Sequence, residues 1–192
     1  ATAYSKEALE FMDTLGGVHL ASSSHPHTYG ALWQLQDHFD ANIALHVADF
    51  DWSSSLRVTH PFDEKLELFP DLRFLHAGVH FAGQAFLLDD ERGILFCGDA
   101  LKFDLDRNDS RRAIAISSHK SFVRSVPLTP KETERYRETF GKCNFAKTYS
   151  PFEQVHNVGS DIVERFLLCL IDSYPQPNFI EISSLDTEAP CE

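Results

Sequence analysis

Residues 24–30 of the chain are SHPHTYG, and they follow a short apolar stretch, residues 18–24, that predicts a strand running into a loop. His25 and His27 are two positions apart, and in an extended chain such residues point to the same side. Both imidazoles can therefore reach one ion. Taken alone, the stretch also fits a polar loop that carries two solvated histidines.

Two further motifs place polar side chains where strands end. Residues 78–83 are GVHFAG, in which two glycines allow a tight backbone and leave His80 free to point inward from a loop tip. Residues 95–99 are LFCGD, an apolar strand that runs into Gly-Asp and puts Asp99 where the sheet opens. Each motif alone also fits an ordinary loop histidine or turn aspartate.

The order of these three motifs resembles the metallo-β-lactamase superfamily, and the resemblance runs from about residue 18 to about residue 149. Residues 24–30 together with LHVAD at 45–49 look like one branch of that superfamily. The resemblance implies an α/β fold, the αββα sandwich, with metal ligands at one edge. The ligands that it implies here are His25, His27, His80 and Asp99.

The chain departs from the family pattern at the second metal site. Tyr29 and Gly30 stand where the family has an Asp and a His that serve a second metal. The late histidine of the family is missing around residues 149–152, and only His156 lies beyond. The resemblance therefore implies one metal ion and a degenerate second site.

Family members usually open with strands that precede the helix which Ser5 is expected to cap here. Those strands are absent from this sequence, so the expected sandwich is truncated at its N-terminal edge. We expect a partner chain, or a second copy in a homodimer, to complete the sheet, because an exposed strand edge invites pairing.

Three histidines and an open position form the ligand set of a catalytic zinc site, and zinc lowers the pKa of bound water to ~7. Asp99 would orient that water or act as a fourth ligand, and the Tyr29 hydroxyl would contact substrate or water. The leading hypothesis is a mononuclear zinc hydrolase of an ester, lactone or thioester bond in a small molecule.

Two other functions stay open. His25, His80 and Asp99 also form a two-histidine, one-carboxylate set, which suits non-haem Fe(II) and implies a persulfide dioxygenase-like oxidoreductase. The missing second site and strands also fit a non-catalytic binding protein with a retained fold. Metal content separates the binding protein from the enzymes, and metal identity separates the two enzymes.

A metal-bound histidine usually donates its second N–H to a carboxylate or a carbonyl. His46 and Asp49 follow the apolar strand of residues 43–47, and we predict Asp49 or Asp51 as such a partner. The alternative is that His46 packs in the core and Asp49 caps a turn.

Composition excludes several partners. The 192 residues include 17 basic and 29 acidic side chains, a net charge of −12, which argues against nucleic acid. The longest apolar run, residues 166–171, is far below the ~20 residues that span a bilayer, so no membrane partner is expected. Four widely spaced cysteines predict reduced thiols and a cytoplasmic protein.

We expect one domain over residues 1–173 and an irregular acidic tail over 174–192. The predicted helices are residues 5–15, 31–39, 129–141 and 160–173, the third opened by a capping box and the last capped by Ser160. Period-two runs over residues 66–74 and 85–97 predict hairpins, and residues 104–126 predict an irregular loop.

Overall fold

The computed structural model of the chain describes residues 3–121, 126–173 and 176–185. A small parallel sheet in the order β1-β2-β3 lies in the N-terminal part. Ser5 caps the first helix by accepting a hydrogen bond from the Ala8 N–H, as predicted. The N-terminal elements are α1 (Lys6–Thr14), β1 (Leu20–Ser22), the 3-10 helix η1 (Pro26–Ala31), α2 (Leu32–Phe39), β2 (Asn42–His46), the 3-10 helix η2 (Val47–Trp52) and β3 (His60–Phe62).

A six-stranded sheet in the order β11-β10-β7-β6-β5-β4 forms the centre of the molecule. Strands β4 to β7 pair antiparallel with their neighbours in the sequence, so both predicted hairpins are confirmed. Strand β10 joins β7 in parallel. The members of this sheet are β4 (Lys65–Phe69), β5 (Leu72–His76), β6 (Ala85–Asp89), β7 (Ile94–Phe96), β10 (Lys147–Tyr149) and β11 (Gln154–Val155).

Two helices cover one face of the central sheet, α3 (Pro130–Phe140) and α4 (Ser160–Asp172). The predicted capping box of α3 is present, because Thr129 Oγ1 accepts from the Glu132 N–H and the Glu132 carboxylate accepts from the Thr129 N–H. The predicted cap of α4 is wrong. Gly159 occupies its N-cap position, and Ser160 is already the first helical residue.

A third sheet corrects two predictions. Residues 104–126 were expected to be irregular, but β8 (Lys102–Asp106) and β9 (Asp109–Ser117) form an antiparallel hairpin. The expected irregular tail is also wrong for residues 180–185, because β12 (Ile180–Glu181) pairs with β9 and α5 (Ile182–Leu185) follows. The alternation of apolar and polar residues in β9 is weak in the sequence, because its inward face consists largely of alanine and its exposed residues include charged side chains.

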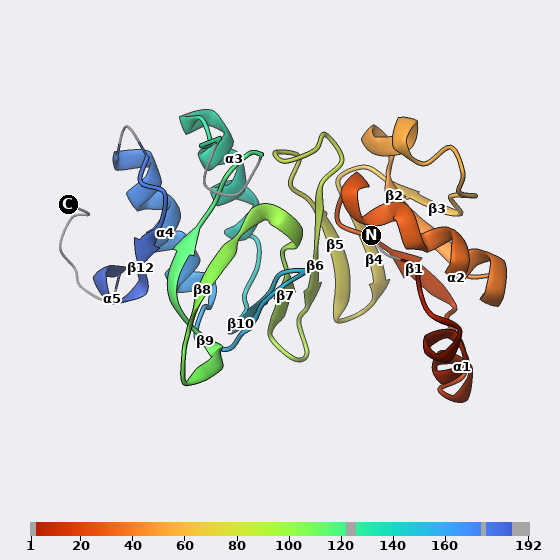
Figure 1. Cartoon of the computed structure of the whole chain (residues 1–192). Coiled ribbons are helices and arrows are strands. Elements are labelled where there is room, and N and C mark those ends of the chain that lie inside the picture. The colour runs from red at the N-terminus through yellow and green to blue at the C-terminus, as the bar shows by residue number, and fades with distance from the viewer. Residues whose placement is uncertain (1–2, 122–125, 174–175, 186–192) are drawn as a thin grey trace.

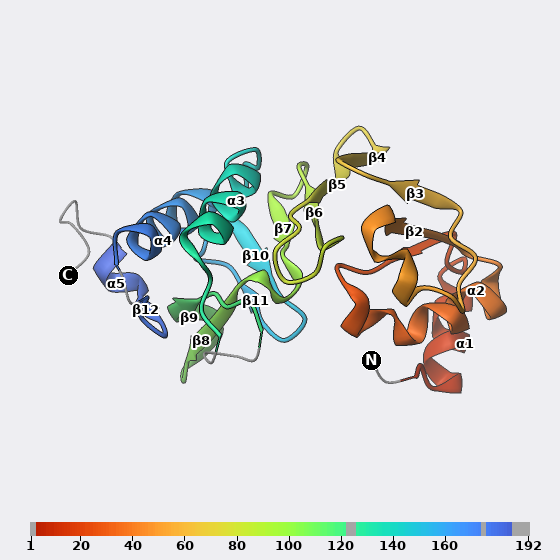
Figure 2. The ribbon, with the colours of Figure 1, turned by 90° about the horizontal axis from the view of Figure 1, so that it is seen from above.

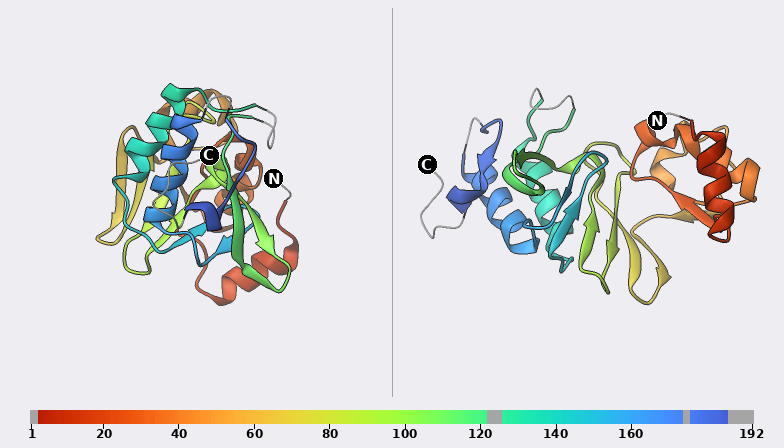
Figure 3. Two further views of the ribbon diagram at one scale, coloured as in Figure 1. Left: turned by 90° about the vertical axis from the view of Figure 1, so that its left-hand side faces the viewer. Right: turned by 60° about the horizontal axis from the view of Figure 1, so that its bottom comes forward.

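Apart from the β8, β9 and β12 sheet and α5, the elements stack in four layers, which are α1 with α2, the small sheet, the central sheet, and α3 with α4 (Figures 1 and 2). One apolar cluster joins α2 to the small sheet, a second lies between the two sheets, and the largest joins the central sheet to α3 and α4. Figure 3 shows the small sheet and its helices at the opposite end from α4 and α5. This is the predicted αββα arrangement.

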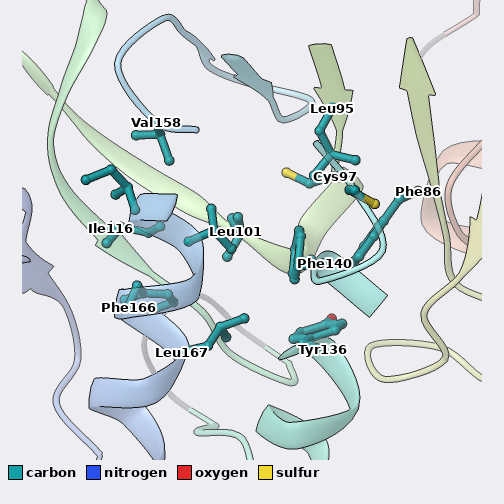
Figure 4. Close-up of a cluster of buried hydrophobic side chains, with 14 of the residues drawn as sticks. Phe86, Leu95, Cys97, Leu101, Ile116, Tyr136, Phe140, Val158, Phe166 and Leu167 are labelled. Atoms are coloured by element: carbon teal, nitrogen blue, oxygen red, sulfur yellow. The ribbon is translucent and has the colours of Figure 1, made fainter. Parts of the chain in front are cut away.

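Aromatic and leucine side chains pack together in the largest cluster (Figure 4). Phe86 of the central sheet stacks on Phe140 of α3 with ring centroids 4.6 Å apart, and Tyr136 lies beside both. Phe166 and Leu167 of α4 close the cluster from the other side and are fully buried. This core fixes the central sheet, from which two of the loops described below arise.

The small sheet ends at β1, beside a mostly apolar cavity of ≈ 380 Å³. Leu20, Leu68, Phe74 and Leu87 are among the side chains that line it, so the two sheets are not fully packed together along this side. The partner chain or second copy expected to complete a sheet stays a prediction.

Within the described ranges, no helix has both the length and the apolar character needed to cross a bilayer. Cys97 and Cys143 are free and buried, and burial raises the pKa of both thiols. Cys169 is disulfide-bonded, so the prediction of reduced thiols is wrong for this residue. The cellular compartment stays a prediction.

The structure predicts that α5 contributes to the main core, although it lies beyond the expected domain boundary at residue 173. Leu185 is 2% exposed, whereas Leu168 on α4 is 39% exposed. We expect Leu185→Ala to lower the free energy of unfolding by ~2–5 kcal/mol, the range for a buried leucine. Denaturant unfolding measures this change. Leu168→Ala is the matched control, and an equal, small loss in both variants would contradict the packing of α5.

Candidate metal centre

His25 and His27 lie at the start of η1, directly after strand β1. Pro26 takes the first helical position, where its fixed φ suits the turn, so only His25 keeps an extended backbone (φ −169°, ψ 166°). The two rings still meet, with centroids 5.4 Å apart. The predicted meeting of the two imidazoles is confirmed, but a turn produces it, not the alternation of an extended strand.

His25 is fully buried and has one ring nitrogen fixed by a neighbour. Its Nδ1 hydrogen-bonds with Ser24 Oγ at 2.8 Å. Its Nε2 is buried and has no hydrogen-bond partner among the described residues. The free nitrogen therefore faces the space that His27 and His80 border.

His80 lies in the loop of residues 77–84, between β5 and β6. Its Nδ1–H donates to the carbonyl of Lys120, which leaves Nε2 as the acceptor nitrogen of a neutral ring. This Nε2 is also buried and without a hydrogen-bond partner in the described part of the chain. Gln84 fixes the backbone by accepting from the His80 N–H at 3.0 Å and from the Tyr136 hydroxyl at 2.8 Å.

Asp99 lies in the 3-10 turn η3 (Gly98–Ala100), which follows strand β7. Gly98 has a φ of +55°, and a Cβ there would stand 2.5 Å from Ser24 Oγ. Only glycine lets this turn approach so closely the loop that carries His25. Gly98 thus sets the separation between Asp99 and His25.

Four candidate ligands converge from three loops. One ligand atom from each of His25, His27, His80 and Asp99 lies within 4.8 Å of all the others. Asp99 Oδ2 is 3.5 Å from His25 Nε2 and 3.9 Å from His80 Nε2. Nitrogen and carboxylate oxygen donors suit zinc, and an unpaired buried polar atom otherwise costs ~1–3 kcal/mol. The residues therefore fit a metal ion.

The charges of the site favour metal binding at neutral pH. Burial raises the pKa of Asp99, but the neighbouring His25 ring and a hydrogen bond from the Lys102 ammonium outweigh burial and hold this pKa well below its usual range. Lys102 Nζ is 2.9 Å from Asp99 Oδ1. Burial lowers the pKa of His80. A charged carboxylate and a neutral imidazole are the forms that bind metals.

Sequence reasoning missed an aromatic wall beside the site. The Phe81 ring lies 4.8–5.7 Å, between centroids, from the rings of all three histidines. Trp52 of η2 packs on Phe81 at 5.9 Å and is 64% exposed. The position of Phe81 directly after His80 could have indicated that this ring lies at the site. Nothing in the sequence links Trp52 to the site.

The prediction that Asp49 or Asp51 holds a ligating histidine is wrong. Asp49 accepts hydrogen bonds from the Gly83 N–H and the Tyr29 hydroxyl, and Asp51 is exposed. Ser24 and the Lys120 carbonyl fix the histidines instead. The carbonyl partner was unpredictable, because every residue carries one.

His46 is buried and stacks on His76, with ring centroids 3.9 Å apart. Its Nδ1 accepts a hydrogen bond from the Ala48 N–H, and its pKa is lowered by burial and by His76. His46 is therefore a packing residue in this structure.

The second metal site has no counterpart among the described residues, where the four ligands above form the one group of three or more His, Cys, Asp or Glu able to hold a metal. His156 lies against Tyr149 instead. Tyr29 is 5% exposed, and its hydroxyl donates to Asp49 at 3.5 Å. Its role in contacting substrate stays a prediction.

Comparison with known sequences gives a distant relative and no family. No protein-family model matches the chain. The uncharacterized protein YmaE of Bacillus subtilis is 26% identical over 167 residues, which cover 81% of this chain and 57% of YmaE. The chain thus spans little more than half the length of that relative.

Solved structures agree with this fold. A di-iron-bound form of the protein TTHA1623 matches with a TM-score of 0.53 and 18% identity, covering 80% of this chain and 78% of that one. A metallo-β-lactamase from Pontibacter korlensis matches with a TM-score of 0.50 and 15% identity, covering 78% and 68%. A HARLDQ-motif mutant of the Cronobacter sakazakii metallo-β-lactamase matches with a TM-score of 0.50 and 13% identity, covering 93% of this chain and 75% of that one. The chain therefore has the metallo-β-lactamase fold.

The contact at Gly98 yields a prediction with a matched control. Gly98 and Gly93 both have a φ near +60°, but a Cβ at Gly93 would meet nothing closer than 3.6 Å. Both alanine variants bear the ~1–2 kcal/mol strain of a left-handed backbone. Only Gly98→Ala would displace Ser24 and His25, so we expect its zinc Kd to rise at least tenfold in a competition titration, while Gly93→Ala keeps the wild-type Kd. Equal affinities would contradict this coupling.

Proposed function

We propose that this metallo-β-lactamase-fold chain is a metal-dependent hydrolase that binds one zinc ion and cleaves an ester, lactone or thioester bond of a small molecule. His25, His27, His80 and Asp99 would hold the ion. The convergence of their ligand atoms within 4.8 Å carries the proposal, together with the two buried Nε2 atoms that have no hydrogen-bond partner among the described residues.

Each residue of the site would have its own role in the hydrolase. A bound zinc ion would supply a Lewis acid that lowers the pKa of water to ~7. Asp99 presents Oδ2 to the histidines while Lys102 holds Oδ1. Because its pKa is low, Asp99 suits the role of an anionic ligand better than that of a proton acceptor. Ser24 and the Lys120 carbonyl keep two of the imidazoles oriented.

Access to the site supports a small-molecule substrate. His25 is buried at the back of the cluster, whereas His27 is exposed. Phe81 stands beside the histidine rings, and the exposed Trp52 packs on the Phe81 ring. A substrate that approaches from the His27 side would meet this aromatic wall, which favours molecules with an apolar group next to the scissile bond.

A second candidate is a mononuclear non-haem iron oxidoreductase of the persulfide dioxygenase type. Asp99 Oδ2 lies within 3.9 Å of Nε2 of both His25 and His80, and these three residues form a two-histidine, one-carboxylate set. A structure of similar fold, TTHA1623, has been described in a di-iron-bound form. The identity of the metal in the purified protein distinguishes this candidate from the zinc hydrolase.

Elemental analysis of protein purified without chelators tests the proposal. We expect about one zinc per chain, lost in the double variant His25→Ala/His27→Ala because two ligands are removed. The matched control is His38→Ala/His156→Ala, which removes two histidines outside the cluster. The same preparations are assayed on ester, lactone and thioester substrates, and hydrolysis should disappear with the metal.

Three other results would redirect the assignment. Iron with thiol- or persulfide-dependent oxygen consumption would favour the oxidoreductase. Metal that the double variant retains would contradict the site. Wild-type protein that binds no metal even after loading would overturn both enzyme candidates and leave a non-catalytic binding protein.

A further inference from the structure

Asp49 is a buried carboxylate that none of the functions above uses. It lies in η2, is 1% exposed, and is flanked by the two loops that carry the candidate histidine ligands. A carboxylate is costly to bury unless hydrogen bonds satisfy it. The groups that donate hydrogen bonds to Asp49 therefore indicate the role of this buried carboxylate.

One partner belongs to the loop that carries His80. The Gly83 N–H donates to Asp49 Oδ1 at 2.8 Å. A Cβ on Gly83 would stand 2.6 Å from Asp49 Cγ and 3.0 Å from His46 Cβ, so only glycine permits this approach. The carboxylate thus holds the backbone of the loop three residues beyond His80.

The other partner belongs to the loop that carries His25 and His27. The Tyr29 hydroxyl donates to Asp49 Oδ2 at 3.5 Å. The Tyr29 ring is fixed in the cluster that contains Leu32 and Leu35 of α2.

We propose that Asp49 is a positioning residue that ties the His25/His27 loop to the His80 loop and so sets the spacing of the metal ligands. It touches neither metal nor substrate and acts through Gly83 and Tyr29. The inference rests on the metal site proposed above. Partners that orient metal ligands typically change metal affinity by ~10–100-fold when they are removed.

The first measurement needs no metal. Amide hydrogen exchange of Gly83 is followed by NMR in the metal-free wild type, in Asp49→Ala and in Asp51→Ala. We expect the Gly83 amide to exchange at least tenfold faster in Asp49→Ala, because its acceptor is gone. Asp51→Ala is the matched control, since Asp51 is an exposed neighbour on the same 3-10 helix. Unchanged exchange in a folded Asp49→Ala would overturn the proposal.

The second measurement tests the link to the ligands. We expect the zinc Kd of Asp49→Ala to rise 10–100-fold. The visible spectrum of its cobalt(II) form should also change, because the angles between ligands change. Asp49→Asn keeps an acceptor for the Gly83 N–H and should recover part of the affinity. A folded Asp49→Ala with wild-type affinity and spectrum would overturn the proposal.

Tyr29→Phe removes only the hydroxyl that donates to Asp49. This variant tests the link between the loops even if Asp49→Ala fails to fold. We expect a rise of a few-fold in zinc Kd, and no further rise when Tyr29→Phe is added to Asp49→Ala, because the two residues act through one contact. An unchanged Kd in Tyr29→Phe would overturn the link between the loops. Absence of zinc binding in the wild type would overturn the metal site itself. Exchange of the Gly83 amide, in contrast, reports only on the hydrogen bond between Gly83 and Asp49.

Discussion

Two buried imidazole nitrogens, Nε2 of His25 and of His80, have no hydrogen-bond partner among the described residues, and much of the surrounding structure holds them in place. An unpaired buried polar atom costs ~1–3 kcal/mol, so a protein keeps two of them side by side only if something else compensates. The opposite nitrogen of each ring is fixed by Ser24 or by the Lys120 carbonyl. A metal ion would provide the missing partner for both.

The four-layer fold brings these nitrogens together. His25 follows β1 of the small sheet, whereas His80 and Asp99 follow strands β5 and β7 of the central sheet. The site therefore bridges two sheets, and its geometry depends on how the loops meet. Gly98 against Ser24 is one such contact, and Asp49 against Gly83 is another. Neither contact tolerates a Cβ on its glycine without a shift.

Side-chain chemistry and motif order allowed the candidate ligands to be predicted, because histidines and an aspartate at strand ends have a recognisable pattern. The supporting contacts could not be predicted in the same way. The Lys120 carbonyl has no side-chain signature, and the Asp49–Gly83 contact joins residues 34 positions apart. The β8–β9 hairpin was missed because Ala113 and Ala115 give its inward face little apolar bulk.

X-ray absorption spectroscopy of protein loaded with one equivalent of zinc tests whether the three histidines and Asp99 bind the ion. We expect a first shell of nitrogen and oxygen donors at ~2.0–2.1 Å, with multiple scattering from three imidazoles. One imidazole should be lost in His80→Ala, because His80 supplies one of the converging ligand atoms. A shell without imidazole scattering, or one that contains sulfur, would contradict the claim that these residues form the metal site.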